Sequence, residues 1–172
     1  VKLPAASKFP AINVKLLNGE VHELGQSAST DRWKLIVVYR GLHCPLCAKY
    51  LAQLQDLASE FDDAGADIIA VSGDGLGKAK EQVEKGSLTV PLAYGLTTEQ
   101  MTEMGLYISN PRSPEETDQP FPEPGLFVLT PDREIQIIDI SNAPFSRPDL
   151  QAILRGLNFA RSKGYPIRGT FK

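Results

Sequence analysis

The chain has 172 residues, of which 42% are hydrophobic and 23% charged, and its formal net charge at pH 7 is −3. This length predicts one globular domain that buries roughly 70% of its unfolded surface. The small negative charge gives no electrostatic basis for binding nucleic acid or an anionic membrane. No apolar run approaches the roughly 20 residues that cross a bilayer, and the first residues lack the apolar core of a signal peptide. We therefore expect a cytoplasmic protein.

The first half of the chain contains patterns typical of strands and of one long helix. Apolar residues on both sides of the turn signal Asn18-Gly19 predict a β-hairpin. Two unbroken apolar runs, rich in β-branched residues, predict buried strands at 34–39 and 67–72. Between them, apolar residues recur at helical spacing, and we expect this helix to run to about Ala64 and to end at Gly65.

The second half predicts shorter elements around a proline-rich segment. The expected elements are a surface helix at 78–85, a short strand at 90–94, a helix at 98–104 capped by Thr97 or Thr98, two strands at 126–129 and 135–140, and a final helix at 147–163 capped by Ser146 and ended by Gly164. Five prolines fall within residues 109–124, which predicts a surface loop insertion.

Strands that alternate with helices imply right-handed crossovers and parallel pairing, whereas the terminal hairpins add antiparallel neighbours. The sequence therefore predicts an α/β domain that spans residues 1–172. Its mixed central sheet has helices on both faces and an N-terminal β-hairpin.

The only two cysteines, Cys44 and Cys47, lie three residues apart where the strand at 34–39 gives way to the helix. This position places the first sulfur at a helix N-terminus, where free N–H groups and the helix dipole favour a thiolate. Two cysteines do not make the disulfide framework of a small secreted protein. Cys44 is the better nucleophile, because Cys47 lies one turn inside the helix and is expected to be buried. Arg40 and His43 are close enough in sequence to stabilise the thiolate.

The chain resembles the thioredoxin fold, and more narrowly the peroxiredoxin-like branch of the alkyl hydroperoxide reductase/thiol-specific antioxidant (AhpC/TSA) superfamily. The segments that carry the resemblance are residues 37–47, 69–74 and 124–132, and the similarity in order and spacing covers about residues 9–160. It implies a three-layer thioredoxin-like fold and an enzyme that works without metal or organic cofactor. An external thiol, such as a thioredoxin or glutathione system, would regenerate it.

Two reactions are consistent with this cysteine pair. In thiol–disulfide exchange, which the local pattern favours, Cys44 attacks a substrate disulfide and Cys47 displaces the reduced product. In peroxiredoxin-type reduction of hydroperoxides, the alternative, Cys44 becomes a sulfenic acid that condenses with Cys47. Peroxiredoxins place a proline seven residues and a threonine or serine three residues before the reactive cysteine, and an arginine on a later strand. Val37, Gly41 and Pro124 stand there instead, so Arg40 or Arg147 would have to replace that arginine.

The thioredoxin pattern requires a proline before a late strand, facing the cysteines. Pro124 is in register for this role, which predicts a cis Glu123–Pro124 peptide bond and exposed backbone for pairing with a substrate chain.

Other interpretations stay open at this level. The cysteines could form half of a zinc site or serve as inert core residues, and His43 and Arg40 could be bystanders. A non-enzymatic redox sensor or binding module is the competing class, with the segment 109–124 as its contact surface. Asp74 follows the strand at 67–72 and could approach the site. The exposed edge expected in such a sheet is also compatible with a homodimer.

Overall fold

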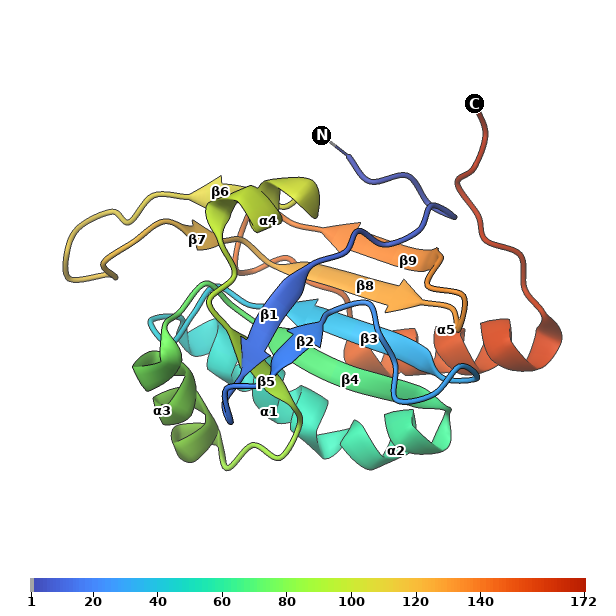
Figure 1. The fold of residues 1–172 in the computed structure, drawn as a ribbon, viewed down its shortest axis with the longest axis horizontal. Coiled ribbons are helices and arrows are strands. Elements are labelled where there is room, and N and C mark those ends of the chain that lie inside the picture. Colours follow the sequence, from blue (N-terminus) through green and yellow to red (C-terminus); the bar gives the residue numbers. More distant parts are fainter. Residues whose placement is uncertain (1) are drawn as a thin grey trace.

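A seven-stranded mixed sheet forms the centre of the protein in the computed structural model, which describes residues 2–172. The strand order is β2-β1-β5-β4-β3-β8-β9 (Figure 1). The strands are β1 (Asn13–Leu16), β2 (Val21–Glu23), β3 (Trp33–Val38), β4 (Ala66–Val71), β5 (Leu92–Tyr94), β8 (Gly125–Leu129) and β9 (Ile135–Ile140). β3 and β4 pair in parallel, β4 and β5 likewise, and the remaining pairs are antiparallel. The prediction of a mixed sheet with an N-terminal hairpin is confirmed.

Helices cover both faces of this sheet (Figure 1). They are α1 (Pro45–Asp56), α2 (Ala58–Asp63), α3 (Leu76–Gly86), α4 (Thr98–Glu103) and α5 (Leu150–Lys163). α1, α2, α3 and α5 pack on one face, while α4 and the N-terminal segment pack on the other. The three-layer, thioredoxin-like arrangement expected from the sequence is confirmed. Within residues 2–172, no helix has the length and apolar character needed to cross a membrane.

The buried central strands explain why the sheet forms where it does. All six residues of β3 are buried, and β4 is nearly as apolar. A strand buried on both faces reads as a continuous apolar run rather than an alternating one. Alternate residues of β3 face the two layers: Leu35 and Val37 pack toward α1, and Ile36 and Val38 pack toward α4.

Two predicted helix boundaries are wrong. The long helix expected to reach Ala64 breaks at Leu57 into α1 and α2, and Leu57 N–H donates to the carbonyls of both Gln53 and Leu54. The resulting bend directs Phe61 into the core. The last helix begins at Leu150 rather than at 147, because a residue before a proline disfavours the helical conformation. Asp149, not Ser146, caps it by accepting a hydrogen bond from Ala152 N–H.

The proline-rich segment is held at both of its ends by a short pair of strands, and residues 110–120 between them form no helix or strand. It begins and ends in a small antiparallel sheet of β6 (Ile108–Ser109) and β7 (Phe121–Pro122). Phe121 is buried, and Glu123 N–H donates to the Tyr107 carbonyl at 2.8 Å. The segment is therefore anchored to the body of the protein at the end of the sheet that carries the cysteines.

A buried lysine lies at the opposite end of β3. Lys34 is only 3% exposed. Its Nζ donates to the Gln26 carbonyl at 2.8 Å and lies 3.0 Å from His22 Nε2. Burial lowers the pKa of Lys34 to about 8, because removing an ammonium from water penalises its charged form. The lowered pKa means that Lys34 reduces the stability of the fold at neutral pH.

Replacing Lys34 with methionine, which has similar length and no charge, should raise the free energy of unfolding at pH 7 by roughly 1–3 kcal/mol. The wild-type lysine loses its folded-state charge above pH 8 but keeps its unfolded-state charge up to about pH 10.5. The wild-type protein should therefore gain stability relative to Lys34→Met as the pH rises above 8. Urea unfolding of both proteins at pH 7 and pH 9.5 measures this. A difference that is equal at the two pH values would contradict the prediction.

Candidate active site

Cys44 lies at the junction of the central strand and the first helix, as the sequence predicted. The turn after β3 brings Cys44 N–H to the Gly41 carbonyl at 3.2 Å, and Cys44 then acts as the N-cap of α1. Its sulfur accepts a hydrogen bond from Cys47 N–H at 3.2 Å. Pro45 occupies the first helical position, where a missing N–H leaves no partner unsatisfied. The helix N-terminus therefore provides a hydrogen bond and a favourable dipole for negative charge on Cys44.

The turn itself is held by Asp74, which does reach the site. The backbone of Gly41 has a φ of +143°, and an added Cβ would lie 2.9 Å from Asp74 Oδ1 and 3.0 Å from His43 Nδ1. Asp74 accepts a hydrogen bond from Leu42 N–H at 2.8 Å. The carboxyl group is buried, and this burial raises its pKa. Position 41 thus needs glycine both for its conformation and for the close approach of Asp74.

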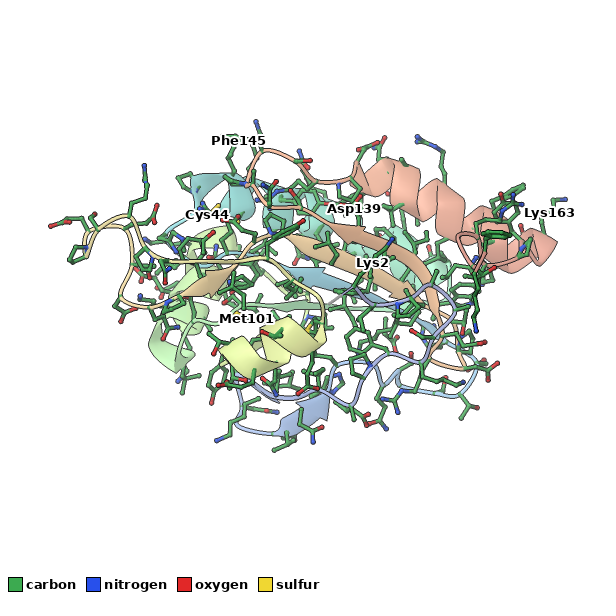
Figure 2. The ribbon with its side chains drawn as sticks, turned by 90° about the horizontal axis from the view of Figure 1, so that it is seen from above. Lys2, Cys44, Met101, Asp139, Phe145 and Lys163 are labelled. Carbon is green, nitrogen blue, oxygen red and sulfur yellow. The ribbon has the colours of Figure 1, made fainter. Side chains whose placement is uncertain are left out.

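Both sulfurs are free thiols, and both residues are buried, with Cys44 2% and Cys47 0% exposed. Figure 2 labels Cys44 beside the start of α1. Cys47 Sγ accepts from Arg40 N–H at 3.4 Å and from Arg147 Nη2 at 3.3 Å. The hydrogen bond between the two thiol groups lowers the pKa of Cys44 and raises that of Cys47, and burial raises the Cys47 value further. Cys44 is therefore the group that ionises, with Cys47 as a protonated neighbour.

Arg40 brings the positive charge to the site. Its guanidinium lies close enough to Cys44 to lower the pKa of that thiol further. The same group lies 4.7 Å from the ring centroid of Phe121 and forms an ion pair with Glu123, Nε to Oε2, at 3.0 Å. The other Glu123 oxygen accepts from Ser109 Oγ at 2.8 Å. Phe121 of β7 and Glu123, the residue after β7, therefore both hold the Arg40 guanidinium.

His43 lies beside the same aromatic ring. Its ring packs edge-on against Phe121, with the centroids 4.6 Å apart and the planes at 63°. Both ring nitrogens are buried, and neither has a hydrogen-bond partner within residues 2–172. Burial, followed by the nearby Arg40 charge, lowers the pKa of His43. The imidazole is therefore neutral at pH 7, and Arg40 rather than His43 provides the cationic charge.

The predicted cis peptide bond before Pro124 is wrong. The chain from residue 2 to 172 contains no cis bond, and Glu123 and Pro124 form the two-residue connection between β7 and β8. Glu123 N–H already donates to Tyr107, and the Pro124 carbonyl accepts from Ser141 N–H at 3.0 Å. This internal pairing occupies the backbone groups that were expected to bind a substrate chain. Pro124 lines a small recess together with Tyr50 and Arg147, and Arg147 donates to Cys47 Sγ.

Phe121 and Glu123 are the site residues that sequence reasoning missed. They follow the cysteines by more than 70 residues and come from a segment that the sequence presented as a loop. The one available signal was an acidic residue, Glu123, two positions before an apolar strand, since an acidic residue that is buried usually has a partner. Among residues 2–172, no three histidine, cysteine or acidic side chains are arranged to hold a metal ion, so the geometry gives no support to a zinc site.

The AhpC/TSA family model matches residues 5–138 of this chain, which is well over half of its length and includes both cysteines. The chain belongs to the AhpC/TSA family. It is therefore a peroxiredoxin-like, thiol-dependent oxidoreductase. No curated protein sequence matches it.

Solved structures place this AhpC/TSA protein among peroxiredoxins in fold. A mutant of peroxiredoxin 6 from Arenicola marina is 17% identical with a TM-score of 0.80, and the match covers 94% of this chain and 75% of that one. Peroxidoxin BcpB from Mycobacterium tuberculosis is 19% identical with a TM-score of 0.73, covering 93% and 97% of the two chains. Mycobacterium bovis AhpC is 17% identical with a TM-score of 0.76, covering 100% and 99%. At these identities the likeness establishes the fold.

Replacing Arg40 with glutamine should raise the pKa of Cys44 by about one unit, because it removes the nearby positive charge but keeps a polar side chain. The rate of iodoacetamide alkylation against pH, with peptide mapping to assign the modified cysteine, measures the shift. Arg155→Gln on the exposed face of α5 is the matched control and should leave the profile unchanged. An unchanged profile in Arg40→Gln would mean that the helix N-terminus and Cys47 alone set the Cys44 pKa.

Proposed function

We propose that this protein reduces small hydroperoxides through Cys44 and resolves the product through Cys47. The Cys44 thiolate attacks the terminal oxygen of the hydroperoxide, the O–O bond breaks, and the alkoxide or hydroxide leaves and takes up a proton. Cys44 is then a sulfenic acid, oxidised by two electrons. The Cys47 thiol attacks the Cys44 sulfur, water leaves with the Cys47 proton, and an intramolecular disulfide forms.

The observation that carries this proposal is a buried, stabilised thiolate beside a buried arginine. With 2% of Cys44 exposed, a hydroperoxide of a few atoms has far easier access to the sulfur than a disulfide on the surface of another protein. Arg40 can also donate to the oxygen that departs as the O–O bond breaks. Arg40 thereby provides the positive charge that peroxiredoxins take from an arginine on a later strand, where this chain has Pro124. The ion pair with Glu123 and the Phe121 ring fix the Arg40 orientation.

The position of Cys47 supports its role in the second step. Its N–H already donates to Cys44 Sγ, so the two residues are in contact before oxidation. Arg147 donates to the Cys47 sulfur and stacks over Tyr50, with 5.0 Å from its guanidinium carbon to the ring centroid. A cation at this sulfur favours the thiolate that forms as Cys47 gives up its proton. Arg147 therefore serves the resolving cysteine, as Arg40 serves the attacking one.

Thiol–disulfide exchange is the second candidate function. It is also the step that would return the oxidised protein to its reduced form after peroxide reduction. The Cys44–Cys47 disulfide must be reduced by an external dithiol, such as a thioredoxin or glutathione system in the cytoplasm. No organic cofactor or metal takes part in this scheme. As a first step, exchange with a protein disulfide has less support, because the backbone at Glu123 and Pro124 is internally paired. A homodimer is compatible with the scheme and is not required by it.

Mixing the reduced protein with hydrogen peroxide in a stopped-flow instrument tests the function. We expect the wild type to lose both thiols, Cys47→Ser to lose one and stop as a sulfenic acid, and Cys44→Ser to react no faster than free cysteine. Dimedone trapping with mass spectrometry identifies the sulfenic acid. The same proteins are then mixed with an oxidised protein disulfide. Faster thiol loss with the disulfide than with peroxide would favour exchange, and no loss with either would leave a non-enzymatic sensor.

A further inference from the structure

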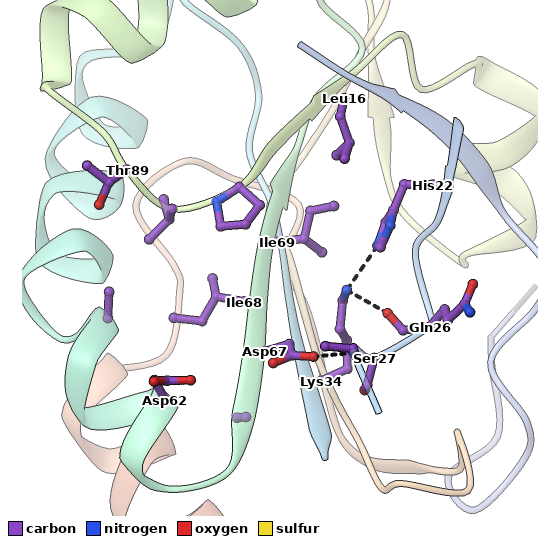
Figure 3. Close-up of a pocket in the computed structure, with 15 residues that line it drawn as sticks. Leu16, His22, Gln26, Ser27, Lys34, Asp62, Asp67, Ile68, Ile69 and Thr89 are labelled. Atoms are coloured by element: carbon purple, nitrogen blue, oxygen red, sulfur yellow. Dashed lines mark hydrogen bonds between the residues drawn. The ribbon is translucent and has the colours of Figure 1, made fainter. Parts of the chain in front are cut away.

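A notch in the central sheet lies at the end opposite the cysteines. β4 begins at Ala66, but β5 pairs with it only at Ala70 and Val71. In the structure of residues 2–172, the first four residues of β4 therefore have no strand beside them on that edge. The residues around the notch enclose a cavity of about 660 Å³, with side chains on both sides of the β4 edge (Figure 3).

Backbone groups of β4 point into this notch. Trp33 N–H donates to the Gly65 carbonyl, and Tyr39 N–H donates to the Val71 carbonyl, so the odd-numbered residues of this stretch face β3. Ala70 N–H donates to Pro91 on the opposite edge. Because peptide groups alternate along a strand, those of Ala66 and Ile68 also face the notch. Neither has a hydrogen-bond partner in the part of the chain that the structure describes.

The two walls of the notch differ in chemistry (Figure 3). On the side of the helices, Ala58, Ile68 and Val90 belong to the core cluster of that layer. The polar residues Asp62 and Thr89 also line the notch on this side (Figure 3). On the other side lie Lys34 and His22. Lys34 Nζ contacts two uncharged groups, the Gln26 carbonyl and His22 Nε2. Within residues 2–172, no carboxylate lies within 4.0 Å of this ammonium.

Two acidic side chains, Asp62 and Asp67, line the notch, and the charge of Asp67 partly offsets the effect of burial on the pKa of Lys34, but both carboxylates already have other hydrogen-bond partners. Asp67 accepts from Ala28 N–H at 2.5 Å and from Arg32 Nε at 2.7 Å, and Arg32 also pairs with Asp62 at 2.7 Å. Neither carboxylate makes a direct ion pair with Lys34. A buried ammonium with an unused N–H group gains most from a charge-assisted hydrogen bond to an incoming carboxylate.

We propose that this notch binds a short extended peptide segment of a partner protein as an added strand beside β4. Its backbone pairs with Ala66 and Ile68, an apolar side chain contacts Ile68 and Ala58, and a glutamate or aspartate side chain binds Lys34. Successive side chains of a strand point to opposite faces, so adjacent apolar and acidic residues match the two walls. The notch has room for about four peptide residues beside the first four residues of β4, because β5 already occupies the rest of that edge.

The backbone of β4 is what makes a peptide the better ligand than a small carboxylate. A carboxylate alone would satisfy Lys34 and leave the Ala66 and Ile68 peptide groups unpaired. An extended peptide provides donors and acceptors at the spacing of a neighbouring strand. The proposal does not depend on the function proposed for Cys44, which lies beyond the other end of β3.

Nuclear magnetic resonance of the reduced full chain, labelled with ¹⁵N, tests the proposal. The probe is a blocked peptide Thr-Val-Glu-Val-Thr, and the readouts are the amide shifts and hydrogen-exchange rates of Ala66 and Ile68. We expect both amides to shift on titration and to exchange at least fivefold more slowly when bound. Two peptides N-methylated at alternate residues keep the side chains. The one whose methyl groups face β4 should lose binding, and the other should keep it.

A double comparison isolates the Lys34 contact. A Thr-Val-Gln-Val-Thr peptide should bind the wild type at least fivefold more weakly than the glutamate peptide does. Lys34→Met should bind both peptides with the same, weaker affinity. Equal amide shifts with acetate at the same concentration would mean that the notch binds any small carboxylate and would overturn the proposal of a peptide site. Equal binding of both methylated peptides, or shifts confined to other residues, would also overturn the proposal. Peroxide reduction by the same samples is measured separately, so the two proposals can fail independently.

Discussion

A buried thiolate must be stabilised by hydrogen bonds and by positive charge, and this requirement organises the surroundings of Cys44. The N-terminus of α1 and the Cys47 thiol provide the hydrogen bonds, and Arg40 provides the charge. Arg40 is itself mostly buried and would be costly without a partner, which Glu123 provides. The proline-rich segment is therefore fixed to the body of the protein by the same charge that serves the sulfur. Catalytic chemistry and local folding share one chain of interactions.

The interactions between residues that are close in the sequence were predictable, and the interactions between distant residues were not. The cysteine pair, the strand before it and the helix after it follow from composition over some twenty residues. Arg40 and His43 were found because they lie on the same turn. Phe121 and Glu123 reach the site only through the pairing of β6 with β7, which leaves no periodic signal in two-residue strands. Without that pairing, the segment looks like an unstructured insertion.

The prediction of a cis bond before Pro124 was wrong for the same reason, because contacts with distant residues decide the conformation there. Pro124 does directly precede the late strand β8, but the conformation of a proline bond depends on what the neighbouring backbone contacts. Here the preceding N–H pairs with Tyr107, and the following carbonyl pairs with Ser141. Both contacts favour an extended chain that is paired within the protein. The helix boundaries at Leu57 and Asp149 failed for a related reason, since the bend and the cap serve packing in the core rather than local periodicity.

The central strand β3 separates two sites with opposite requirements. At its C-terminal end, both cysteines are buried, which fits the small hydroperoxide substrate proposed for them. At its N-terminal end, β5 pairs only with the last two residues of β4, so the Ala66 and Ile68 peptide groups have no strand beside them, and the buried Lys34 ammonium has no carboxylate in direct contact. Closing this notch with a longer β5 would satisfy the backbone of β4, but it would also enclose a charge that has no carboxylate partner. A buried charge retained at a cost to stability is hard to explain by the fold alone. A bound acidic segment would satisfy both the ammonium and the open strand edge, which is why the two features point to a single ligand.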